Sequence, residues 1–231
     1  MSMDSGTWTG GERVENRWGL AAVCAVATLV LLAGTASAAA GLDGERLRAL
    51  ALAGDTEALR PEGEALLPRL ARLYESTATP RERAQIARVF YQLGWPSPEA
   101  KRVLMADVRT PDPELRLEVQ WALGRVSADA DVVDVLLYSM RHDASPLFRD
   151  KAACALAYDQ IHLVPEQKVR LLDGLIGALD DPTPQVRQIS LQALRILTGQ
   201  TKGYQPQSSR ERRLAAIEEW QRWLAEYRSQ L

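Results

Sequence analysis

The sequence predicts an all-α solenoid, built from pairs of helices that stack one on the next. A Pro-x-x-Arg motif recurs four times, and its prolines stand 33, 33 and 38 residues apart. An apolar stripe at helical spacing follows each arginine. A fixed period of about 20–50 residues is typical of repeat architectures, because one short unit cannot bury its apolar face without a neighbour.

The composition is that of a folded domain without a strongly charged surface. The chain has 231 residues, is 46% hydrophobic and 25% charged, and carries a formal net charge of −2. These values fit one medium-sized domain with a sizeable core. The near-neutral balance gives no reason to expect a nucleic-acid partner, because binding to a phosphate backbone needs a basic surface.

An export signal is the first element along the chain. Residues 18–42 contain no charged side chain, and a dense apolar run over residues 20–32 leads into Ala36-Ser37-Ala38. This order is typical of a secretory signal peptide that is cleaved after a small-x-small motif. We therefore expect residues 1–38 to be removed, which leaves Ala39 as the mature N-terminus.

Two alternatives remain for this apolar stretch. About 20 apolar residues also suffice to cross a bilayer, so residues 19–40, if uncleaved, would form a single-pass membrane anchor. A buried helix of a soluble protein is the other alternative. Arg13 and Arg17 on the N-terminal flank favour an N-terminus inside the cell, which places the rest of the chain in the periplasm or cell envelope.

The segment ahead of the repeats, residues 39–63, is expected to form a linker and a capping helix. The sequence indicates helices over residues 43–53 and 61–76, with a break between them at Gly54-Asp55. Atypical ends are needed because the first and last units of a stack would otherwise expose apolar faces.

Four copies of the repeat are expected over residues 64–199. In each copy the proline begins the second helix, where its missing amide has no helical partner, and the residue before it caps that helix. The positions three, six, seven and ten residues after the arginine share one face, which we expect to be buried. The four motifs are Pro80/Arg83, Pro113/Arg116, Pro146/Arg149 and Pro184/Arg187.

The best copy covers residues 171–199. It predicts a helix over residues 168–179, an acidic turn, and a second helix that begins at Pro184 with Thr183 as its N-cap. The five extra residues of the last interval predict a lengthened loop between units over residues 158–166.

This pattern resembles the HEAT repeat family, in particular its short bacterial form, in which some relatives resemble bilin lyases. The resemblance implies a right-handed α-α superhelix. It also implies that turn aspartates and helix arginines form a ladder between units, with Asp143 and Arg149, and Asp181 and Arg187, as members. Threonines replace the aspartate in the first two copies, so we expect an incomplete ladder there. A tetratricopeptide array has a similar period, but its signature of Trp, Leu-Gly and Tyr is missing.

The C-terminal segment, residues 200–231, is expected to close the stack. A loop with Gly203 and Pro206 precedes a helix, whose start we place at Ser208 as the N-cap of a capping box with Glu211.

Two tryptophans, Trp220 and Trp223, lie on the apolar stripe of this last helix. We expect them to cap the stack, because burial is the usual fate of aromatic side chains at helical spacing. An exposed aromatic platform for a ligand is the alternative.

No motif in the sequence predicts catalysis or metal binding. A Gly-rich phosphate loop and a Gly-x-Ser-x-Gly motif are both missing. His142 and His162 each stand without a second ligand at metal-site spacing. Cys154 lies among small apolar residues, where we expect a packed, unreactive thiol. We therefore expect no enzymatic activity, no cofactor, no metal ion and no small-molecule substrate.

The second helices of a solenoid present an extended surface, which is the usual binding face of such proteins. Its solvent-side positions hold Trp121, Arg125 and Tyr158, the residue types that dominate interface energetics, together with Arg88 and Gln192. Packing of Trp121 against a neighbouring repeat remains an open alternative.

We therefore expect a non-catalytic scaffold or adaptor that binds a protein or peptide through these five residues. An accessory or lyase-like protein that acts on a prosthetic group is the first alternative. A membrane-anchored structural element is the second.

Overall fold

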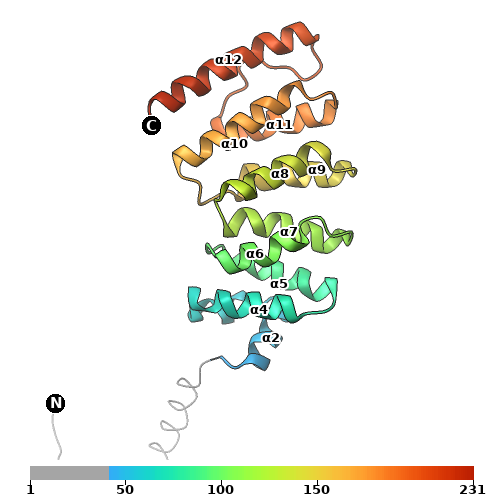
Figure 1. The fold of residues 1–231 in the computed structure, drawn as a ribbon, viewed down its shortest axis with the longest axis vertical. Helices are drawn as coiled ribbons and strands as arrows, with labels where there is room; N and C mark the ends of the chain where they lie inside the picture. Colours follow the sequence, from blue (N-terminus) through green and yellow to red (C-terminus); the bar gives the residue numbers. More distant parts are fainter. Residues whose placement is uncertain (1–41) are drawn as a thin grey trace, which may run out of the picture. The chain divides into compact units, whose positions relative to one another are not determined.

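The computed structural model describes residues 42–231 (Figure 1). The expected signal peptide or anchor, within residues 1–40, lies outside the described residues. Residues 44–231 form one compact unit, and every regular element in it is a helix or a helical turn. No helix in this part of the chain is long and apolar enough to cross a membrane.

Four pairs of helices follow one another along the stack. The first helices are α4 (Leu67–Ser76), α6 (Pro98–Asp107), α8 (Ala130–His142) and α10 (Pro165–Gly177), and α10 is extended by the 3-10 turn η4 (Ala178–Asp180). The second helices are α5 (Pro80–Leu93), α7 (Pro113–Val126), α9 (Pro146–Cys154) and α11 (Pro184–Thr198), and α9 is extended by the π-helical turn η3 (Ala155–Asp159). Each second helix packs on the next one, so these helices form one layer of an α solenoid (Figure 1).

The four helices that begin at a proline are confirmed. Pro80, Pro113, Pro146 and Pro184 each open their helix. The side chains of Thr79 and Asp112 accept hydrogen bonds from the backbone amides of Glu82 and Leu115, as capping residues do. Ser145 and Thr183 occupy the N-cap position, but their side chains make no such bond, so the expected cap of Thr183 is wrong. The face predicted to be buried is buried except at Leu197, which is half-buried. The residues three positions after each arginine are fully enclosed: Ile86, Val119, Ala152 and Ser190.

The front of the stack differs from the single helix expected over residues 61–76. After α2 (Gly44–Ala53) come α3 (Thr56–Leu59) and two 3-10 turns, η1 (Arg60–Glu62) and η2 (Glu64–Leu66), before α4 begins. Gly63 separates the two turns with a φ of 65°. Glycine adopts this left-handed conformation without the steric cost that other residues incur, so the helix is interrupted here.

The back of the stack is closed by α12 (Arg210–Ser229), which packs on α10 and η4. The expected capping box of Ser208 and Glu211 is wrong. The N-cap is Ser209, which accepts the amide of Arg212, and the hydroxyl of Ser208 bonds to the side chain of Gln205 instead.

A glycine in α7 allows η3 to approach that helix closely. A Cβ atom on Gly124 would lie 2.8 Å from Cβ of Asp159 and 3.3 Å from the carbonyl oxygen of Ala155. Neither atom is the end of a flexible side chain, so α7 and η3 would have to move apart. Gly177, at the end of α10, has open space where its Cβ would be.

We expect Gly124→Ala to lower the free energy of unfolding by about 1–3 kcal/mol, the usual cost of overpacking. Gly177→Ala is the matched control, and it should raise the free energy of unfolding by about 0.4–1 kcal/mol, because alanine restricts the unfolded chain more than glycine does. Urea denaturation followed by circular dichroism measures both changes. A Gly124→Ala protein at least as stable as the parent would show that α7 and η3 are not in close contact.

Candidate binding site

The four repeat arginines lie at the turns between paired helices. Each guanidinium donates to the backbone carbonyl oxygen six residues earlier: Arg83 to Thr77 at 2.8 Å, Arg116 to Thr110 at 2.9 Å, Arg149 to Asp143 at 2.7 Å, and Arg187 to Asp181 at 2.9 Å. Because the acceptor belongs to the main chain, threonine serves as well as aspartate. The prediction of an incomplete ladder in the first two copies is therefore wrong.

The same guanidinium groups also reach the following unit. Their acceptors there are the Asp107 carboxylate for Arg83 (3.1 Å), the Asp143 carboxylate for Arg116 (2.7 Å), the Gln185 side chain for Arg149 (2.6 Å) and the Pro206 carbonyl for Arg187 (3.1 Å). The Asp181 carboxylate pairs with Arg141 instead, at 3.3 Å. Arginine therefore connects each unit to the next, although Asp143 and Asp181 offer Arg149 and Arg187 their carbonyl groups and not their carboxylates.

Besides the arginine contacts at the turns, a second row of contacts, made of ion pairs, joins neighbouring helices in the layer of second helices. It consists of Arg48 with Glu82 between α2 and α5 (2.9 Å), Arg88 with Glu118 between α5 and α7 (2.6 Å), and Arg125 with Asp159 between α7 and η3 (3.1 Å). Among residues 42–231, no ion pair continues this row from α9 or η3 to α11.

Three of the five candidate binding residues contact side chains of a neighbouring unit. Arg88 and Arg125 are held by Glu118 and Asp159. The Arg125 guanidinium also lies 4.6 Å from the centre of the Tyr91 ring. Trp121 is half-buried beside the same ring, with the two ring centres 6.3 Å apart, so it contacts the preceding repeat.

Asp159 is buried on the inner side of its pair with Arg125. Burial raises the pKa of the Asp159 carboxyl above its ordinary value, while Arg125 and Tyr91 act in the opposite direction. The charged form of Asp159 therefore depends on the arginine beside it.

We expect Arg125→Met to lower the free energy of unfolding by about 2 kcal/mol at neutral pH, less than for a fully buried pair because the Arg125 side chain is partly exposed. Without the cation the pKa of Asp159 rises further, so the carboxyl of the variant is neutral over a wider range of acidic pH. The loss of stability should therefore shrink as the pH falls from the pKa of Asp159 in the folded variant to the lower pKa of Asp159 in the folded parent.

The measurement is urea denaturation of the parent and Arg125→Met across mildly acidic to neutral pH. Arg102→Met removes an arginine from an exposed pair with Glu75 and is the matched control, which should change stability little. A loss that is independent of pH would contradict the role given to Asp159.

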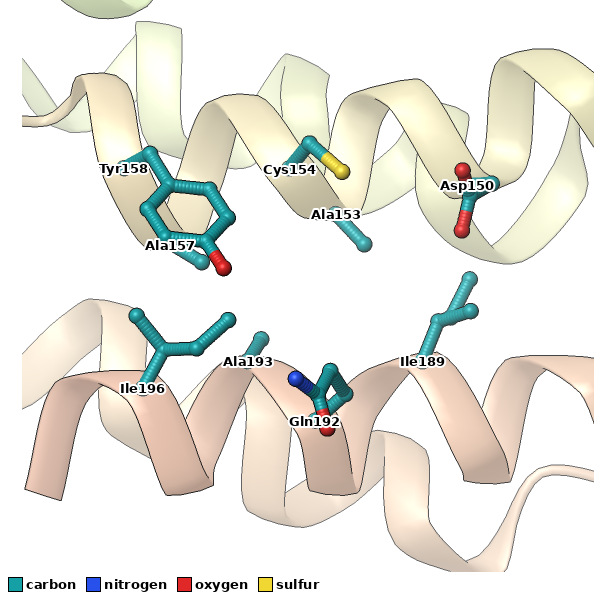
Figure 2. A pocket seen from close by; sticks show the side chains of 9 residues that line it. All are labelled: Asp150, Ala153, Cys154, Ala157, Tyr158, Ile189, Gln192, Ala193 and Ile196. Carbon is teal, nitrogen blue, oxygen red and sulfur yellow. The ribbon is translucent and has the colours of Figure 1, made fainter. Parts of the chain in front are cut away.

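Tyr158 and Gln192 lie on opposite walls of a groove at the junction where the second row of ion pairs stops (Figure 2). We call it the α9–α11 groove. Its volume is about 210 Å³. It is lined by Asp150, Ala153, Cys154, Ala157 and Tyr158 from α9 and η3, and by Ile189, Gln192, Ala193 and Ile196 from α11.

The groove combines an apolar surface with unused polar groups. The Tyr158 side chain is 57% exposed. Within the described part of the chain, neither its hydroxyl nor the Gln192 amide makes a hydrogen bond. A wider hollow of about 710 Å³ adjoins the groove, shares Asp150, Ile189 and Gln192 with it, and extends along α11 to Arg195 and then to Pro206 in the C-terminal loop.

Cys154 lies in the wall of this groove and is half-buried, so it is more accessible than the packed core thiol expected from the sequence. Burial raises the pKa of the thiol, with a smaller contribution from the nearby Asp150 carboxylate. The reactive thiolate is therefore disfavoured at neutral pH.

The loop before α10 has a role that the sequence did not indicate. Nε2 of His162 lies 2.8 Å from the carbonyl oxygen of Gly94, and the Gln160 amide donates to the carbonyl of Gly124 at 3.5 Å. Residues 160–164 thus reach back to the C-terminal ends of α7 and α5. The extra length of the last interval predicted a loop over residues 158–166, but the loop is shorter, because Tyr158 and Asp159 belong to η3 and α10 begins at Pro165.

His142 stands apart from His162, at the end of α8, where its ring lies 4.7 Å from the ring centre of Tyr138. Within residues 42–231, no three His, Cys, Asp or Glu side chains are grouped in a way that could hold a metal ion.

The two tryptophans of α12 differ in their surroundings. Trp220 is fully buried against the last repeat. Trp223 is half-buried, meets Trp220 edge to face at 5.5 Å, and stacks on Tyr227 at 5.6 Å. Of the two, only Trp223 therefore stays partly exposed, and the ammonium group of Lys202 lies 5.7 Å from the centre of its ring.

Residues 64–157 match the family described as HEAT repeats. The matched segment runs from η2 into η3 and so covers the first three units. The fourth unit, α10 with α11, lies beyond the match. It is joined to the third by the bond from Arg149 to the Gln185 side-chain oxygen and by the bond from the Gln185 amide to the carbonyl oxygen of Pro146. No curated protein is similar enough in sequence to count as a match.

Proposed function

We propose that this chain, a HEAT-like repeat protein, is a non-catalytic scaffold that binds a protein partner through its second helices. HEAT repeats generally mediate protein interactions. The observation that carries the proposal is the α9–α11 groove, where Tyr158 is exposed beside an apolar surface at the junction that lacks an ion pair.

The difference between the junctions supports the choice of this one as the binding site. At the junctions of α5 with α7 and of α7 with η3, arginine and carboxylate satisfy each other across the helices. At the junction with α11, the Tyr158 hydroxyl and the Gln192 amide remain available. A tyrosine that offers both an apolar ring and a hydroxyl is a frequent anchor of protein interfaces. Trp121, Arg125 and Arg88 lie at the two preceding junctions, outside the groove.

A non-catalytic role agrees with the chemistry of the groove. Its two reactive side chains are Cys154, whose raised pKa disfavours the thiolate, and Asp150, which lies one helical turn away on the same helix. Neither histidine lines the groove, so no imidazole stands beside the thiol to act as a base.

We expect a photo-crosslinking amino acid at position 158 to capture a protein in cells that produce the full chain. The same amino acid at position 138 is the matched control, because Tyr138 is 51% exposed but lies on α8 in the first-helix layer. Capture at 158 and not at 138, read by mass spectrometry, supports binding through the second helices. Equal capture at both positions, or none at 158, would contradict it.

We also propose that the domain acts outside the cytoplasm, and the support for this is the apolar sequence over residues 20–32 followed by Ala36-Ser37-Ala38. Mass spectrometry of the native protein is expected to find Ala39 at the N-terminus. An intact N-terminus in the membrane fraction would indicate the anchor instead. An intact N-terminus in the cytoplasmic fraction would reject export.

A further inference from the structure

We propose that the α9–α11 groove recognises a peptide segment of the partner that carries an aliphatic or aromatic side chain and, close to it, a lysine or arginine. This inference rests on the proposed function and specifies the chemistry of the partner. It is drawn from the shape, the charge and the unused hydrogen-bonding groups of the groove.

The apolar part of the groove accounts for the apolar side chain. Three alanines, Ala153, Ala157 and Ala193, lie between the larger side chains of Ile189, Ile196 and Tyr158 (Figure 2). Because alanine carries only a methyl group, an entering side chain can approach both helices closely. Burial of apolar surface in such a hollow is the main favourable contribution to association.

The charge of the groove accounts for the basic residue. Asp150 is the only charged residue among the nine that line it, and its side chain is 45% exposed. Its one ion-pair contact is with the adjacent residue Lys151, at 3.6 Å, and such an exposed pair contributes little. The carboxylate can therefore accept a cation from a partner.

The positions along the helix set the spacing of the two groups. Asp150 precedes Cys154 by four residues and Ala157 by seven, which corresponds to about 6–10 Å along the axis at about 1.5 Å per residue. An extended peptide advances about 3.3 Å per residue. The basic residue is therefore expected two or three positions from the apolar one.

The Gln192 amide favours a peptide over a lipid. Its side chain offers both a donor and an acceptor, which match the carbonyl and amide groups of a peptide backbone. A lipid chain would fill the apolar part but would leave Gln192 and Asp150 without partners, and unpaired polar groups weaken binding when they lose water.

The test uses a displayed library of random peptides, selected against the whole purified chain. Synthetic copies of the enriched peptides are then titrated by fluorescence polarisation. The enriched peptides should carry an aliphatic or aromatic residue and a basic residue at the spacing above. Tyr158→Ala should weaken their binding about tenfold or more. Asp150→Asn should weaken it about two- to fivefold at low salt, and this difference from the parent should shrink as the salt concentration rises, because salt screens the ion pair.

Two matched variants serve as controls. Tyr138→Ala removes an equally exposed aromatic side chain from the other layer and should leave binding unchanged. Arg195→Gln alters a charge in the adjoining hollow and should not weaken binding. Circular dichroism verifies that each variant is folded, which is expected because the substituted side chains are exposed.

Cys154 supplies a second, position-specific measurement. Its rate of alkylation by iodoacetamide, read at Cys154 by peptide mass spectrometry, should fall when an enriched peptide is bound. Peptides without a basic residue, binding that survives Tyr158→Ala, or an unchanged alkylation rate would each overturn the proposal.

The result also separates this inference from the proposed function. If Trp121→Ala abolishes peptide binding and Tyr158→Ala does not, the groove is not the peptide site, but the proposed scaffold function is retained. Selection of no peptide, together with no capture at position 158, would overturn both.

Discussion

Each repeat arginine bonds to a carbonyl oxygen at the turn of its own unit and to a second acceptor beyond that unit, and the stack depends on this pair of bonds. Burial of apolar faces drives the helices together, but it is non-directional and does not fix how far one unit slides on the next. Arg116 joins the turn of its own unit to Asp143 of the following one. Charge-assisted bonds of this kind have defined geometry, so they fix the register of neighbouring units.

Local signals predicted much of the fold, and contacts distant in sequence account for what was missed. The prolines and the apolar stripes located all four second helices, because both features act within one helix. The arginine acceptors at Thr77 and Thr110 were missed, since a backbone carbonyl has no signature in the sequence. The spacing identified Tyr158 and Gln192 as solvent-side residues. The pairing of Arg88 with Glu118, 30 residues away, was not predicted, because it depends on how the helices pack.

The π-helical turn η3 explains why the row of ion pairs between the second helices ends before α11. Its last two residues serve different neighbours, since Asp159 pairs with Arg125 of α7 while Tyr158 lines the groove beside α11. Turns of this kind are frequent at functional sites, where an irregular helix redirects side chains. The same short segment therefore supplies the last carboxylate of the row of ion pairs to α7. Toward α11 it presents Tyr158, which forms no ion pair.

The last repeat arginine ends on a main-chain oxygen, since Arg187 donates to the carbonyl of Pro206 in the C-terminal loop. Any polypeptide turn offers such an oxygen, whatever its side chains. The closing segment therefore needs no particular side chain to satisfy the arginine that ends the row.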